Sequence, residues 1–90
     1  MKMLTMAVKN ATNTAYLKMC YVMDDYMNLE SSMTAEEAIN EIKRLSNFEQ
    51  LKKKAGLTQT ALSYINNVED AAKRMIERIG GNNNEALWIN

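Results

Sequence analysis

The side chains that could carry out chemistry in this 90-residue chain are few in kind. There is one cysteine, Cys20, and no histidine, so an internal disulfide and the common Cys/His zinc sites are excluded. A catalytic thiol at Cys20 would have no imidazole base, and we interpret this residue as a small buried hydrophobe. Neighbouring carboxylates such as Asp24-Asp25 and Glu36-Glu37 point about 100° apart on a helix, which favours solvated or capping roles. We therefore expect no enzyme, no cofactor and no metal.

Positive charge is the one chemical property that gathers in a short segment. The chain has a net charge of zero, but between residues 43 and 54 five cations, Lys43, Arg44 and Lys52 to Lys54, stand against one carboxylate, Glu49. Such a cluster suits contacts to phosphate groups, which dominate non-specific binding to nucleic acids. A lysine run is also typical of a solvated helix face, so the charge alone does not decide.

Two short helices joined at a glycine are predicted beside these lysines. Gly56 follows an apolar-periodic segment and can adopt the left-handed conformation that stops a helix. Thr58 can then cap a second helix through its hydroxyl. Five apolar side chains are spaced to fill the inside of the corner: Leu51, Ala55, Leu57, Leu62 and Ile65. The outward face of the second helix then carries Gln59, Thr60, Ser63 and Tyr64.

Residues 48–67 resemble the helix-turn-helix of the phage repressor and Cro family, in which the second helix enters a DNA groove. The family pattern L-A-x-K-A-G-x-[ST]-Q-x-x-[IL]-S-x-I-x-N is matched here by Leu51, Lys54, Ala55, Gly56, Leu57, Thr58, Gln59, Leu62, Ser63, Ile65 and Asn67. The likeness extends more loosely over residues 34–80. Two positions depart from the pattern, because Lys52 replaces the usual Ala and Phe48 replaces a frequent phosphate-contacting Gln. A motif kept only as a packing unit is therefore an alternative.

The resemblance implies a set of residues that would contact double-stranded DNA. Residues 58–67 would form the recognition helix, with Gln59 and Thr60 at base edges. Further along the same helix come Ser63, Tyr64 and Asn67, with Thr58 at its start. The phosphates would be held by Lys52, Lys53 and Lys54.

The remaining helices are predicted from capping signals and apolar periodicity. The capping box Thr34 to Glu37 begins one helix, and Ser46 to Glu49 repeats the same pattern. Asn66 or Asn67 is expected to cap a helix over residues 68–79, which Gly80-Gly81 ends. Residues 81–90 then form a flexible Gly/Asn linker and a tail whose Trp88 docks on the core or on a neighbouring subunit.

Residues 1–33 have no counterpart in the family. An apolar stripe at helical spacing predicts one long helix ending near residue 32: Leu4, Val8, Ala11, Ala15, Met19, Val22, Tyr26, Leu29 and Met33. Further apolar side chains exceed what one small core buries and suggest a dimerisation or partner-binding element: Met3, Met6, Ala7, Tyr16, Leu17, Tyr21, Met23 and Met27. Two alternatives stay open: the helix wraps its own domain, or residues 2–8 form a short strand or loose arm.

These patterns together predict a small all-α helical bundle of one domain, containing a helix-turn-helix over residues 34–80 and a long N-terminal helix. The expected function is that of a small phage-type or bacterial DNA-binding transcriptional regulator, a cytoplasmic homodimer without a membrane segment. The alternative is a small phage-encoded inhibitor or adaptor, of the anti-CRISPR kind, that binds a protein partner through a helical face. It draws support from the neutral charge.

Overall fold

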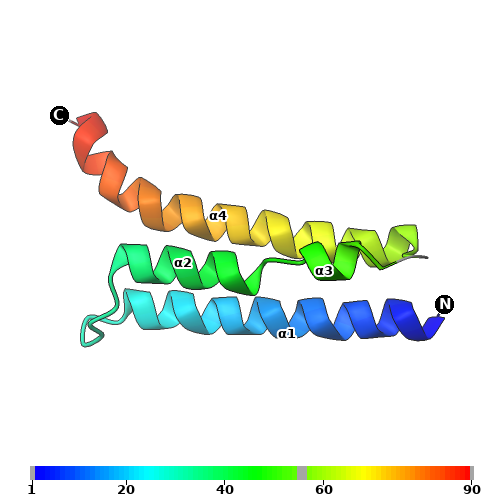
Figure 1. The fold of residues 1–90 in the computed structure, drawn as a ribbon. Coiled ribbons are helices and arrows are strands. Elements are labelled where there is room, and N and C mark those ends of the chain that lie inside the picture. Colours follow the sequence, from blue (N-terminus) through cyan, green and yellow to red (C-terminus); the bar gives the residue numbers. More distant parts are fainter. Residues whose placement is uncertain (1, 55–56, 90) are drawn as a thin grey trace.

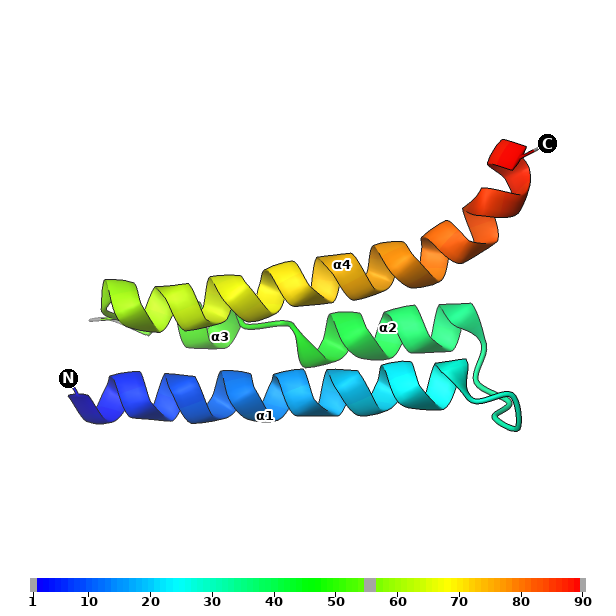
Figure 2. The same cartoon turned by 180° about the vertical axis from the view of Figure 1, so that it is seen from behind.

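The computed structural model describes residues 2–54 and 57–89, with side chains described for residues 5–54 and 57–80. Its elements are α1 (Lys2–Met27), α2 (Ala35–Leu45), α3 (Glu49–Lys52) and α4 (Gln59–Ile89). The all-α class and the long N-terminal helix are confirmed, and the described ranges contain no strand. Helices α1 and α4 run in the same direction, and α2 followed by α3 runs back beside them (Figures 1 and 2).

Helix α1 is continuous over its 26 residues, so the alternative of a strand or loose arm at residues 2–8 is wrong. One buried position on it is polar, because the side chain of Thr12 is only 1% exposed. Its hydroxyl donates to the carbonyl oxygens of Val8 and Lys9 at 2.9 and 3.0 Å. These bonds offset the cost of burying the hydroxyl. Ala11, predicted as a core residue beside it, is exposed.

The predicted end of α1 near residue 32 is several residues too late. Beyond the helix, the side-chain oxygen of Asn28 accepts from the backbone amide of Glu30 at 2.9 Å, and the Ser31 hydroxyl accepts from that of Met33 at 3.1 Å. Such local bonds compete with helical ones and favour turns. Leu29, predicted as part of the buried stripe, therefore lies in a loop and is fully exposed.

The capping box at the start of α2 is confirmed. The Thr34 hydroxyl accepts from the backbone amide of Glu37 at 3.1 Å, and the Glu37 carboxylate accepts from the amide of Thr34 at 2.9 Å. Together they satisfy two of the amides that a helix start leaves unpaired. The apolar side of α2 is buried at Ala38 and Ile42.

The second predicted box is wrong, although the chain does break where it was placed. Ser46 is the C-cap of α2, and its hydroxyl donates to the carbonyl oxygen of Lys43 at 3.4 Å. The side chain of Asn47 accepts from the amide of Glu49 at 3.2 Å. Phe48, 8% exposed, inserts into the core and precedes the single helical turn of α3.

Helix α4 is one helix of 31 residues, so the predicted breaks at Asn66-Asn67 and at Gly80-Gly81 are wrong, as is the flexible linker after them. The Asn pair is exposed, and the buried residues on either side of it keep one helical stripe. A Cβ placed on Gly80 would meet no atom within 4 Å, so this glycine marks no close contact. The C-terminal end of α4 bends away from the other helices (Figure 1). The predicted docking of Trp88 falls outside the described side chains.

The stripes of the helices meet in one core, whose buried apolar residues are Val8, Ala15, Met19, Ala38, Ile42, Phe48, Ala61, Ile65, Val68, Ala72 and Ile79. Ile65 is fully buried, as predicted, but Leu62 is 37% exposed. The reason is that Ala61, four residues before Ile65, takes the inward position at the start of α4. Leu51 and Leu57 pack partly buried against this core.

Leu62 and Ile65, which were both predicted to fill the inside of the corner, should therefore differ in their contribution to stability. Ile65→Ala should lower the free energy of unfolding by about 2–5 kcal/mol, because it removes fully buried methyl groups and leaves a cavity. Leu62→Ala should cost clearly less, since its side chain already contacts water. Urea denaturation of both variants measures this difference, and equal losses would contradict the assigned burial.

The capping box should give the stability a pH dependence. The pKa of Glu37 lies below its ordinary value of 4.5. The larger cause is the hydrogen bond with the backbone amide of Thr34, and the smaller is the interaction with the Thr34 side chain. Because the folded-state pKa lies below the unfolded one, this contribution is complete above the unfolded value and is lost as the pH falls through the folded one. The melting temperature of Glu37→Gln should therefore fall less than that of the parent between about pH 7 and about pH 3, as thermal melting curves measure.

Candidate functional site

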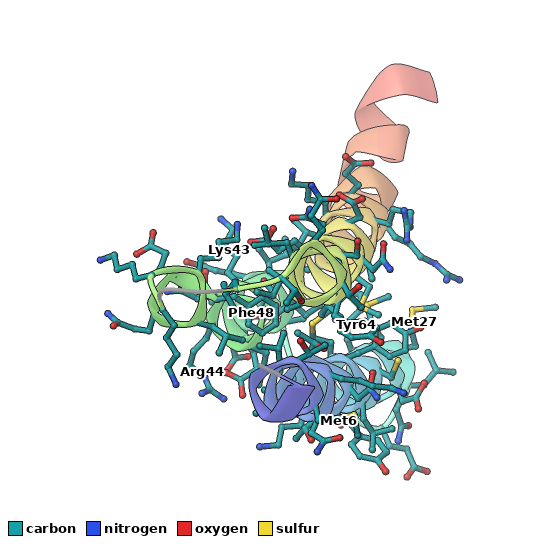
Figure 3. The ribbon with its side chains drawn as sticks, turned by 90° about the vertical axis from the view of Figure 1, so that its right-hand side faces the viewer. Met6, Met27, Lys43, Arg44, Phe48 and Tyr64 are labelled. Atoms are coloured by element: carbon teal, nitrogen blue, oxygen red, sulfur yellow. The ribbon has the colours of Figure 1, made fainter. Side chains whose placement is uncertain are left out.

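Four of the side chains predicted to contact DNA are exposed on the first turns of α4: Gln59, Thr60, Ser63 and Asn67. The predicted cap is present, because the Thr58 hydroxyl accepts from the backbone amide of Ala61 at 3.1 Å. Tyr64 was expected to face outward with the others. It is instead partly buried against the core, between α4 and α1 (Figure 3).

The lysines proposed to hold phosphates do not form a uniform set. The ammonium nitrogen of Lys52 lies 2.7 Å from a carboxylate oxygen of Glu69 on α4. This pair joins α3 to α4 and already neutralises Lys52. Lys53 and Lys54 are exposed, and no carboxylate among the described side chains pairs with them.

The cations of α2 are separated as well. Two guanidinium nitrogens of Arg44 each donate to a carboxylate oxygen of Glu41 at 2.7 Å. This bidentate bond raises the pKa of Arg44 and lowers that of Glu41. Lys43 and Arg44 point to different sides of α2 (Figure 3). The positive cluster expected from the sequence is therefore divided between paired and unpaired side chains.

The corner between the two predicted helices differs from the steep crossing typical of a helix-turn-helix. Helix α3 is a single turn of four residues. Seen end-on, α3 and the start of α4 both appear as rings, so their axes are nearly aligned, with the two helices running in opposite directions (Figures 1 and 3). The expected recognition segment is the first part of the much longer α4. Ala55 and the predicted left-handed Gly56 lie outside the described residues.

A second surface is the open groove between α1 and α4, with a volume of about 280 Å³. Its lining comes half from each helix: Tyr16, Cys20, Met23 and Asp24 on α1, and Ala71, Arg74, Met75 and Arg78 on α4. Tyr16 is 44% exposed, and Met27, on the same side of the bundle as Tyr64, is 51% exposed (Figure 3). We call the surface formed by the eight lining residues, which do not include Met27, the α1–α4 groove.

The two sides of the α1–α4 groove differ in charge. Arg74 and Arg78 lie one helical turn apart on α4, and neither forms an ion pair with a described carboxylate. Asp24 is on the α1 side. Hydrogen bonding and charge interaction with Cys20 raise the pKa of Tyr16, while the positive charge of Arg74 acts in the opposite direction.

The groove offers apolar contact, two guanidinium groups and one carboxylate. Its thiol, that of the half-buried Cys20, has no histidine to activate it, because the sequence contains none. Among the described residues, no group of three His, Cys, Asp or Glu side chains is placed to hold a metal ion. No helix in the described ranges combines the length and apolar character needed to span a bilayer.

Sequence reasoning identified the parts of this groove without joining them. The surplus apolar residues of the first helix included Tyr16 and Met23, and the helix predicted over residues 68–79 contains Arg74 and Arg78. The sequence feature that pointed toward the groove was the excess of large apolar side chains on α1. Its pairing with α4 follows only from the tertiary fold, as the 3.1 Å contact between the hydroxyls of Thr5 and Thr58, which are 53 residues apart, illustrates. No protein-family model, curated protein or solved structure significantly matches the chain.

Proposed function

We propose that this protein is a helical interaction module that binds a protein partner along the α1–α4 groove, as an inhibitor or adaptor would. The observation that carries the proposal is the exposed Tyr16, which lines the groove together with two arginines that have no described carboxylate partner. Met27, which is exposed as well, lies one helical turn beyond Met23 of the lining. The core leaves both of these large side chains in contact with water.

The composition of the groove supports this proposal. Tyr, Met and Arg are enriched in the central parts of protein interfaces, where Tyr and Arg often supply much of the binding energy. Met adapts its shape to a partner because its side chain is unbranched and flexible. The groove combines these types with an open shape, and its lining extends for about two turns along each helix, which suits a polypeptide segment.

DNA binding is the second candidate, and a specific observation favours it. The outer face of α4 exposes Gln59, Thr60 and Ser63, and the unpaired Lys53 and Lys54 precede the same end of the helix. A polar helix face flanked by cations suits a phosphate backbone and base edges. Two observations argue against DNA binding. Lys52 is already paired with a carboxylate, and α3 is only a single turn.

Self-association is proposed for a different face of α1. Met6, Leu17 and Tyr21 are 54%, 52% and 61% exposed. Met6 points away from α4 (Figure 3). Helical spacing places these three side chains along one line of α1 outside the groove. They support the homodimer expected from residues 1–33, because symmetric homodimers are the commonest soluble oligomers.

A photo-crosslinking side chain placed at Tyr16 or at Ser63 reports what each face contacts in the cells that produce the protein. We expect protein adducts from position 16 and none from position 63. Met27→Glu, which adds charge beside the groove, should reduce the adducts at position 16, whereas Gln59→Ala should not. DNA adducts at position 63, with none at 16, would replace the proposed function by the second candidate.

Sedimentation of the purified chain tests the self-association. A species of about twice the chain mass is expected at micromolar concentration, and Leu17→Glu with Tyr21→Ser should shift it to the chain mass by placing charge and polarity on the contact. Both residues are exposed in the single chain, so the fold should persist by circular dichroism. A parent that sediments at the chain mass throughout would refute the dimer.

A further inference from the structure

We propose that the occupant of the α1–α4 groove is an amphipathic helix with an acidic flank, whose carboxylates contact Arg74 and Arg78. This inference rests on the proposed function and specifies the chemistry of the partner.

The shape of the groove favours a helix over a small molecule. Its volume of about 280 Å³ is open along the bundle between two helices that run in the same direction. Small-molecule pockets of about 300–1,000 Å³ enclose most of the surface of their ligand, whereas this groove is open to solvent. An amphipathic helix instead lays a row of apolar side chains into a groove, at positions i, i+3 or i+4, and i+7. Met23, Ala71 and Met75 supply the apolar contact for such a row.

The charges of the groove select the flank of that helix. Arg74 and Arg78 are four residues apart, so their side chains emerge about 5–6 Å from each other. Two carboxylates with the same i, i+4 spacing on a partner helix would match them. The cations are exposed and unpaired among the described residues, so they require no broken ion pair before binding.

The opposite side of the groove fixes the orientation. Asp24 on α1 would repel a second acidic flank and attract a cation. A partner helix with carboxylates on one flank and a Lys or Arg on the other therefore fits with its chain in one direction along the groove, and the opposite direction places like charges together. Specificity of this kind arises from repulsion of the wrong partner as much as from attraction of the right one.

A second copy of this chain fits the groove poorly. A two-fold interface places the same patch of each copy against itself. In every such arrangement the four arginines of the two copies, Arg74 and Arg78 from each, share only two carboxylates, one Asp24 from each. The self-association proposed above uses a different face of α1.

Two designed helical peptides of about 15 residues, or about four turns, test the inference. Both carry the same Leu row. The first has a Glu pair at i, i+4 on the flank facing α4 and a Lys on the other flank, and the second carries Lys at all three positions, so that neither direction of binding places a carboxylate near α4. We expect fluorescence anisotropy to show tighter binding of the first peptide, by roughly twofold to fivefold for each charge pair, as for exposed ion pairs.

Charge-reversed variants of the protein complete the test. Arg74→Glu with Arg78→Glu should invert the preference between the peptides, whereas Lys18→Glu with Lys73→Glu, outside the groove, changes the net charge equally and should keep it. No binding of either peptide, or no inversion in a variant that circular dichroism shows to be folded, would overturn the inference. If crosslinks at Tyr16 persist in that case, the proposed function survives and only the acidic helix is refuted. Loss of self-association in the charge-reversed variant would identify a second copy as the occupant and also overturn it.

Discussion

Burial of the apolar stripe of α4 against α1 and α2 is the constraint on which the rest of the structure depends. The stripe is continuous, with Ala61, Ile65, Val68, Ala72 and Ile79 all buried. Each of its buried Val and Ile side chains contributes about 1.5–3 kcal/mol. A weak helix former costs at most about 0.7 kcal/mol relative to Ala. An unbroken stripe therefore outweighs the local preference of Asn66 and Asn67 for a cap, and α4 passes through them.

A continuous α4 sets the positions of the other elements. It runs beside α1 from the contact between the Thr5 and Thr58 hydroxyls onward, so the chain between them must return within α2 and α3. The insertion of Phe48 into the core interrupts that return and leaves α3 as one turn. The ion pair of Lys52 with Glu69 then holds α3 against α4. Because it is partly exposed, this pair positions the turn more than it stabilises the fold.

Features decided within a few residues were predictable from the sequence. The Thr34 box and the Thr58 cap each depend on bonds that span three residues, and both are present. Features decided by tertiary packing were not. The partner of Lys52, the inward turn of Tyr64 and the groove itself depend on which helices pair and in which direction. The end of α1 differs from the prediction for another reason, because the turn bond of Asn28 competes with a continued helix although the apolar stripe extends further.

The residues that resemble a helix-turn-helix specify less than the motif implies. A helix stop followed by a Thr cap determines that the chain ends one helix and begins another, whereas the angle between the helices depends on what each buries. Here α3 buries little beyond Leu51, while α4 is aligned by a stripe five buried residues long. The long helix therefore runs alongside the other helices, and its polar outer face lies along the side of the bundle. The same alignment leaves the apolar flank of α1 facing Arg74 and Arg78, so the candidate binding surface is the part of the helix pair that the core does not cover.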